Sequence, residues 1–183
     1  MLNKKTILIL TIQQIITLKL HLTLGLLAFS IPFFIAGPQL LTGTIVNLCL
    51  IIGTIKLPFK RLIPLIVLPS IGAFLHGVIF GPLTFFLLYF LPFIWLGNFV
   101  LITTFLKINK RLSLTLRIII SAGIKSLLLF LFANIFYQLH IVPSVFLNLM
   151  GLFQFITAVS GGILALLLLK LLNSPYERSK YTN

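Results

Sequence analysis

The chain has 183 residues, of which 60% are hydrophobic and 8% charged, and its formal net charge is +13. A core of this size cannot hide so much apolar surface, which excludes an ordinary soluble domain. One transmembrane helix takes about 20 apolar residues, so the chain has room for about six. The cations stand in short stretches between apolar segments, which favours contact with anionic membrane lipid and no nucleic-acid partner.

The first 19 residues are predicted to form a basic, interfacial N-terminal segment. Residues 7–18 are apolar but too few to cross a bilayer alone, and Lys19 and His21 would be poorly placed at the centre of a longer span. We therefore expect an interfacial segment that leads into the first span. A single tilted helix over residues 6–30 is the alternative.

The rest of the chain predicts an all-α integral membrane protein, a six-transmembrane-helix bundle. The spans are expected at 20–37, 40–55, 62–81, 83–106, 118–138 and 147–170. They form one membrane domain over 20–172, followed by a polar C-terminal tail over 173–183. All 14 Lys and Arg residues then fall on one side of the membrane. By the positive-inside rule that side is the cytoplasm, so both termini are predicted to be cytoplasmic.

Lys125 is the one cation that this arrangement places inside a span. It lies seven residues past Ile118, or ~10 Å into the fifth span at the rise of an α-helix. Its stem is long enough to snorkel to the cytoplasmic interface, and this interpretation is preferred. A functional cation inside the bundle is the alternative.

Apolar runs are interrupted most often in the segment 37–98. It contains most of the 9 prolines and 12 glycines of the chain, together with polar side chains. In a bilayer, broken helices and polar side chains survive mainly where they are buried in protein or line a cavity. This segment is therefore the first place to look for a functional site.

The polar side chains of the spans concentrate in the outer half of the predicted bundle. A mostly apolar cavity with convergent amides, hydroxyls and an imidazole is typical of small-molecule sites. The expected site opens away from the cytoplasm and suits a neutral or weakly anionic ligand, although each residue alone could also be a helix-packing contact. The predicted ligand-binding residues are Gln39, Thr42, Asn47, His76, Tyr89, Asn134, Gln154 and Thr157.

The composition gives little support for catalytic activity. The only acid is Glu177, in the tail, so paired-carboxylate and triad chemistry lack their partners. The only cysteine is Cys49, and the three histidines lack the spacing of a metal site. We expect no enzyme activity, no bound metal and no cofactor.

Several stretches resemble a family of small prokaryotic membrane proteins. They are GPQLLTGTIVN at 37–47, LPSIGA at 68–73, PFIWLGN at 92–98, Lys125 with Ser126, and QFITAVSGG at 154–162. That family is similar to the substrate-binding S components of energy-coupling factor (ECF) vitamin transporters, over about residues 30–170. The resemblance implies a multi-pass protein of the prokaryotic plasma membrane that captures a vitamin-like ligand. It also implies a transmembrane coupling subunit and an ATPase pair as partners.

One feature departs from the pattern that the resemblance implies. Such subunits often dock the coupling subunit through two alanines four residues apart on the first helix. The first span here has Gly25, Ala28 and Ala36 instead.

The leading functional hypothesis is thus a substrate-capture subunit of an importer, without catalysis of its own. The alternative is a non-transporting membrane scaffold or assembly protein that binds a membrane partner through its glycine notches. A passive pore for small neutral solutes is disfavoured, because its polar line should cross both halves of the bundle.

Overall fold

The protein is described from a computed structural model, which covers residues 4–35, 38–80 and 85–172. Parts of the predicted segments lie outside these residues. They are residues 1–3 of the N-terminal segment, 36–37 at the end of the first span, 81 at the end of the third, 83–84 at the start of the fourth, and the tail over 173–183.

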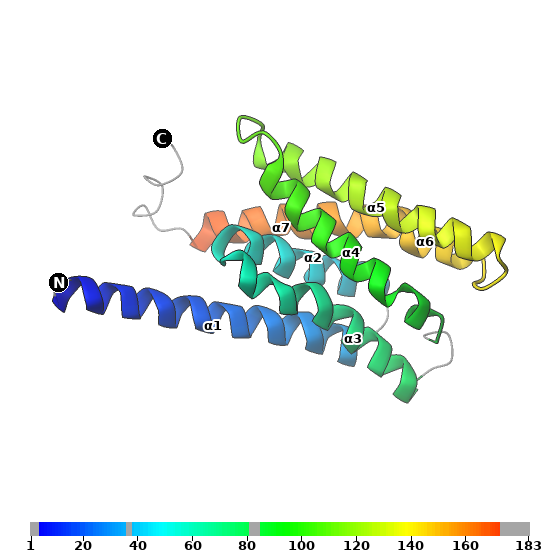
Figure 1. Cartoon of the computed structure of the whole chain (residues 1–183), viewed down its shortest axis with the longest axis horizontal. Helices are drawn as coiled ribbons and strands as arrows, with labels where there is room; N and C mark the ends of the chain where they lie inside the picture. Colours follow the sequence, from blue (N-terminus) through cyan, green and yellow to red (C-terminus); the bar gives the residue numbers. More distant parts are fainter. Residues whose placement is uncertain (1–3, 36–37, 81–84, 173–183) are drawn as a thin grey trace.

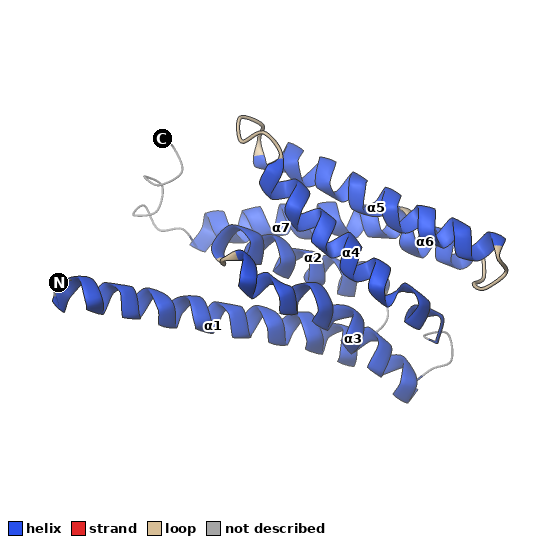
Figure 2. Cartoon of the chain, in the orientation of Figure 1, coloured by secondary structure: helices blue, strands red, loops and turns tan. Residues whose placement is uncertain are grey.

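The described residues form an antiparallel bundle of helices (Figures 1 and 2). The elements are α1 (Lys4–Phe34), α2 (Gln39–Lys56), the 3-10 helix η1 (Phe59–Leu62), α3 (Ile63–Phe80), α4 (Phe85–Lys107), α5 (Leu114–Gln138), α6 (Val145–Met150) and α7 (Leu152–Leu172). Six stretches, the last made of α6 and α7 together, are long and apolar enough to cross a membrane. Within the described residues the predicted all-α class is confirmed, and so are six stretches that could span a membrane. The first helix begins well before residue 20, and the other boundaries differ by a few residues.

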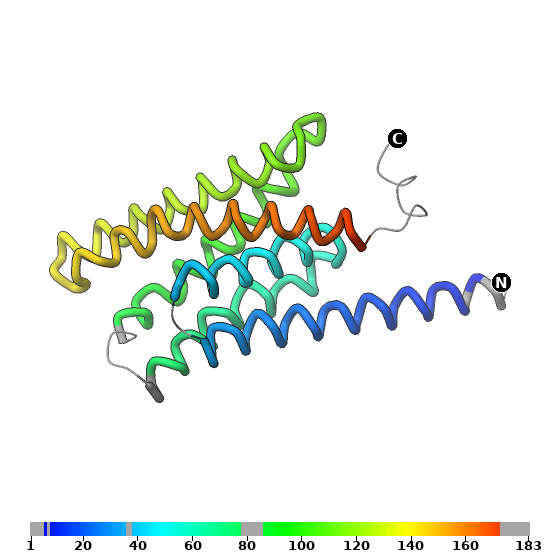
Figure 3. Tube along the Cα trace, turned by 180° about the vertical axis from the view of Figure 1, so that it is seen from behind, coloured from blue at the N-terminus to red at the C-terminus, as the bar shows by residue number. Residues whose placement is uncertain are grey.

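The first helix is continuous where the sequence analysis expected a separate segment. α1 runs for 31 residues without a break at Lys19, as in the alternative of a single helix. Its only proline is Pro32, in the last turn, so nothing earlier removes a backbone hydrogen bond. The N-terminal part of α1 extends beyond the other helices (Figure 3), and side chains such as Leu8 and Ile16 are exposed on it.

The last span is interrupted, which the sequence analysis did not predict. Gly151 separates α6 from α7 with φ −96° and ψ −97°, outside the helical region. A Cβ atom at this position would lie 2.7 Å from the Leu147 carbonyl oxygen and 3.0 Å from the Phe130 ring. The break therefore needs a residue without a side chain.

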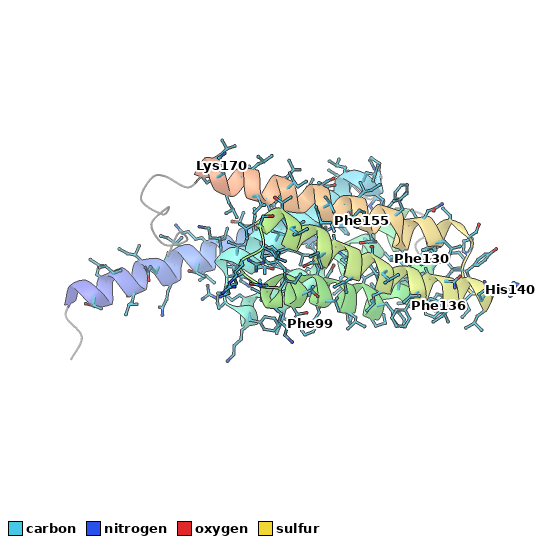
Figure 4. The ribbon with its side chains drawn as sticks, turned by 90° about the horizontal axis from the view of Figure 1, so that it is seen from above. Phe99, Phe130, Phe136, His140, Phe155 and Lys170 are labelled. Carbon is cyan, nitrogen blue, oxygen red and sulfur yellow. The ribbon has the colours of Figure 1, made fainter. Side chains whose placement is uncertain are left out.

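Basic side chains mark one end of the bundle, which we call the basic end. They belong to the last turns of α2, α4 and α7 and to η1: Lys56, Lys60, Arg61, Lys107 and Lys170. His140, after α5, lies at the opposite end from Lys170 (Figure 4). Arg117 on α5 is buried at the basic end and donates to the Phe105 carbonyl of α4 from Nε, at 3.1 Å. It thereby satisfies a carbonyl that the end of α4 leaves without an intrahelical partner.

The buried apolar side chains form two clusters. One, which includes Leu50, Leu65 and Leu101, joins the basic half of the bundle. The other, which includes Phe90 and Phe146, joins α4, α5 and α6 towards the opposite end, where the two rings stack at 5.3 Å. A member of each cluster, Val46 of the first and Phe146 of the second, lines a cavity.

Small residues bring α2 and α7 into direct backbone contact. A Cβ atom on Gly161 of α7 would collide with the Thr44 carbonyl oxygen and would lie 2.7 Å from the Leu48 nitrogen of α2. Backbone cannot move aside as a side chain can, so Gly161 fixes the distance between the two helices. Close approach through small residues is the usual basis of helix packing in membranes.

This contact predicts opposite effects of alanine at two glycines. Gly161→Ala is expected to destabilise the protein by about 1–3 kcal/mol, because the added methyl group must push α7 away from α2. Gly123→Ala is the matched control, since its Cβ would meet only Phe155, at 4.0 Å. Alanine favours a helix over glycine by ~1 kcal/mol, so the control should be neutral or stabilising. Unfolding in mixed detergent micelles measures both, and equal effects would contradict the assignment.

Candidate ligand-binding cavity

A cavity of about 320 Å³ opens among the helices. Its walls come from every helix of the bundle: Pro32 of α1; Gln39, Thr42, Gly43, Val46 and Asn47 of α2; Pro69, Ser70 and Ala73 of α3; Leu87, Ile94 and Asn98 of α4; Lys125 of α5; Val145, Phe146, Leu149 and Met150 of α6; and Gln154 of α7. The walls are mostly apolar, with a few polar groups. This is the composition and, at its lower end, the size of a small-molecule site.

The cavity reaches from the end opposite the basic residues to the centre of the bundle. Gln39 is the first residue of α2, and Asn47 lies eight residues later, ~12 Å along the axis. Asn98 is nine residues before the basic end of α4, and Lys125 is near the middle of the 25-residue helix α5. We call the part near Gln39 the mouth and the part near Lys125 the floor.

Four of the predicted site residues line this cavity. They are Gln39, Thr42, Asn47 and Gln154. Thr157 is buried beside the floor, one turn after Gln154, where its hydroxyl accepts from Asn47 Nδ2 at 3.3 Å. The structure thus brings α2 and α7 together as the site requires, and ligand binding by these residues remains a prediction.

The other three predicted residues lie outside the cavity. His76 of α3 lies 2.6 Å, through Nδ1, from the Phe33 carbonyl oxygen of α1, and because a carbonyl only accepts, this nitrogen carries the proton. Tyr89 is 51% exposed on the outside of α4, with its ring against Phe136 at 6.4 Å. Asn134 is half-buried on α5 and is absent from the cavity lining. The position of a residue along a span does not tell which face of the helix meets the cavity.

Lys125 corrects the preferred sequence interpretation. Its side chain does not snorkel to the basic end, because only 2% of it is exposed and its Nζ donates to Asn47 Oδ1 and to Asn98 Oδ1, both at 2.8 Å. The alternative, a cation inside the bundle, describes its position. α5 also begins at Leu114, four residues before the predicted start, which places Lys125 deeper than expected.

The partners of both amides fix the direction of these hydrogen bonds. Asn47 Nδ2 donates to the Gly43 carbonyl at 2.8 Å, so its Oδ1 must face Lys125. Asn98 Nδ2 donates to the Ile66 carbonyl at 3.0 Å, which orients its Oδ1 in the same way. Each amide therefore uses its donor on backbone and offers its acceptor to the lysine. The three side chains tie α5 to α2 and α4 at the floor.

The wall on α3 depends on Pro69. Proline has no N–H and distorts the helical turn before it. Ile66 lies in that turn, and its carbonyl receives the hydrogen bond from Asn98. The next residue, Ser70, donates to Val67 O at 3.0 Å and accepts from Trp95 Nε1 at 2.7 Å. The proline-interrupted turn is thus held to α4 by two side chains, and Asn98 and Ser70 are lining residues that depth alone did not select.

The polar groups of the lining are amides, hydroxyls and one amine. Lys125 and the two asparagines supply fixed polar groups, and no residue of the lining is an acid, a cysteine or a histidine. Within the described residues no group of three metal-ligating side chains comes together. Cys49 is buried in the apolar cluster of the basic half, away from the lining.

Comparison with protein-family models, with curated proteins and with solved structures gives no match for this chain.

The floor predicts energetic coupling between Lys125 and Asn98. Lys125→Met leaves two amide oxygens without this donor, and Asn98→Leu leaves the lysine with one acceptor and removes the side-chain donor to the Ile66 carbonyl. Each change should cost about 1–3 kcal/mol of unfolding free energy. The double variant should lose less than the sum, by about 0.5–3 kcal/mol, because both changes break the same hydrogen bond.

Asn134→Leu serves as the control for this cycle. Asn134 is nine residues from Lys125 on the same helix, ~14 Å along the axis. Combined with Lys125→Met, it should give additive losses. Unfolding in detergent measures all variants, and additivity in the Lys125–Asn98 cycle would show that the hydrogen bond is not formed in the protein.

Proposed function

We propose that the protein is a membrane-embedded substrate-capture subunit of a small-molecule importer, which binds its ligand from the outer side and relies on partner subunits for ATP hydrolysis. The observation that carries the proposal is the cavity, which combines apolar walls with polar groups at its mouth and floor. The resemblance of residues 30–170 to S components of ECF transporters agrees with such a role. The plasma membrane of a prokaryote is the location that the resemblance implies.

The mouth contains a polar group that is free to meet a ligand. The side chain of Gln154 lines the cavity, and none of the hydrogen bonds found within the described residues involves it. Gln39, in contrast, donates from Nε2 to the Leu149 carbonyl at 2.9 Å and so ties α2 to α6. Gln154 is therefore the mouth residue whose loss should affect a ligand without loosening the helices.

Release of a ligand toward the cytoplasm would require movement of the helices around the floor. Prolines interrupt α1, α3 and α4 at Pro32, Pro69 and Pro92. Such positions lack one backbone hydrogen bond and are the usual points at which helices bend. The two at Pro32 and Pro69 line the cavity, so bending there would change its shape.

The scaffold alternative is less supported by the glycines. Gly161 is packed against α2 and Gly162 against Ile118 of α5, so these notches are already filled within the chain. A partner protein would have to use another surface. A pore is disfavoured because the cavity lining ends at Asn98 and Lys125, and includes none of the basic-end residues.

The capture hypothesis predicts retained ligand and specific partners. Purification in mild detergent from the native cells should recover an ATPase pair and a coupling subunit, with a small molecule near one equivalent per chain. Gln154→Leu should reduce the retained molecule about tenfold, which corresponds to one lost hydrogen bond of ~1.4 kcal/mol. Ala73→Leu should reduce it further by filling the cavity.

The matched control is Tyr89→Phe, which removes a polar group from the outer surface of α4. It should leave the retained ligand unchanged. Recovery of a stoichiometric, unrelated membrane protein, together with an empty cavity, would favour the scaffold instead.

The outward opening of the cavity predicts the sidedness of cysteine labelling. In a Cys49→Ala background, a cysteine at Pro38, next to the mouth, should react with a membrane-impermeant maleimide in intact cells. A cysteine at Lys107, at the basic end, should react only after permeabilisation, because the positive-inside rule places it in the cytoplasm. The reverse pattern would place the cavity mouth on the cytoplasmic side and would exclude capture from outside.

A further inference from the structure

The floor of the cavity contains a lysine, and none of the described residues is acidic. The whole chain has one acid, Glu177, and it belongs to the terminal segment after α7. Lys125 is nevertheless fully enclosed, with 2% of its side chain exposed. Burial of an ammonium without a counter-charge is unfavourable, and neutral amide oxygens compensate it only in part.

The hydrogen bonds of Lys125 leave room for one more acceptor. An ammonium has three N–H donors, and two of them meet Asn47 Oδ1 and Asn98 Oδ1 at 2.8 Å. Lys125 also lines the cavity. A molecule that reaches the floor can therefore accept the third hydrogen bond.

Other groups around the cavity add to the attraction for an anion. Arg117 lies eight residues before Lys125 on α5, ~12 Å toward the basic end, and its guanidinium is occupied by the Phe105 carbonyl and ring. The helices α2 and α7 begin near the mouth, and the N-terminus of a helix carries a partial positive charge. No carboxylate of the lining opposes these charges.

We propose that Lys125, held by Asn47 and Asn98, binds the carboxylate of the ligand, and that the ligand is a small organic monocarboxylate with an apolar body. This inference rests on the proposed capture function and names the chemical class of its substrate. The carboxylate meets Nζ at the floor. The apolar body lies along Val46, Ala73, Ile94 and Met150, and a polar group at its other end reaches Gln154.

The charge of the site selects a monoanion. Lys125 is the only cationic side chain of the lining, so a phosphate dianion would bring one uncompensated charge into an apolar cavity. A cationic ligand would be repelled by the ammonium. A neutral amide of the same shape could fill the cavity but would leave the charge of Lys125 without a counter-ion.

Matched acids and amides test this inference. Thermal unfolding of the purified protein in detergent is measured with hexanoate or hexanamide, and with hexadecanoate or hexadecanamide. Each pair has the same chain and differs in charge at the head group. Hexanoate is expected to raise the unfolding midpoint by a few degrees at saturation, because a ligand stabilises the state that binds it. Hexanamide should give a much smaller shift. The long pair distinguishes a water-soluble acid from a membrane fatty acid. Hexadecanoate should raise the unfolding midpoint more than hexanoate only if the natural ligand is a membrane fatty acid.

The variants Lys125→Gln and Lys170→Gln provide the matched controls. Both remove one positive charge, but Lys170 is exposed at the basic end of α7. Lys125→Gln should abolish the difference between acid and amide, whereas Lys170→Gln should retain it. A purely structural role of Lys125 would lower the unfolding midpoint of the variant and would create no acid–amide difference in the native chain.

The outcomes separate this inference from the function on which it rests. Equal shifts with acid and amide that are both lost in Ala73→Leu would keep the cavity as a binding site and overturn the carboxylate. Equal shifts of the unfolding midpoint with acid and amide in every other case, including no shift with either, would also overturn the proposed carboxylate contact. An acid-specific shift that persists in Lys125→Gln would place the anion elsewhere. The capture function itself is tested by the retained ligand and the co-purifying partners. The unfolding measurement does not examine either of them.

Discussion

The enclosed amine of Lys125 is the constraint on which the centre of the structure depends. Its Nζ meets one amide of α2 and one of α4, so three helices must hold their positions for the hydrogen bonds to form. Each amide in turn binds backbone, Asn47 at Gly43 and Asn98 at Ile66. A polar network in a low-dielectric interior stabilises the fold only when its members are satisfied together.

The cavity follows from the way the bundle packs around this network. On one side, Gly161 lets α7 touch the backbone of α2 beside Asn47, at the depth of the floor. On the other side, the break at Gly151 separates α6 from α7, and Phe146 of α6 packs on Phe90. The cavity lies beside these contacts, with the polar network as its floor.

Binding and stability share residues in this arrangement. Asn47 and Asn98 both hold Lys125 and line the cavity, whereas the Gln154 side chain lines it without a hydrogen bond to another described residue. Changes at the floor are therefore expected to alter the fold and the site together. Changes at the mouth separate the two, which makes Gln154 the more informative position for ligand binding.

The sequence by itself determined the class of protein, the number of spans and their approximate limits, because the length of an apolar run is set by the thickness of a bilayer. It also selected Gln39, Thr42, Asn47 and Gln154, since polar side chains at the same depth tend to share a site. Only the tertiary structure decided which faces meet. The rotation of α3, α4 and α5 about their axes turns His76, Tyr89 and Asn134 away from the cavity and turns Lys125 and Asn98 toward it. That rotation is set by packing between helices far apart in the chain, such as the glycine contact of α7 with α2, and no local pattern contains it.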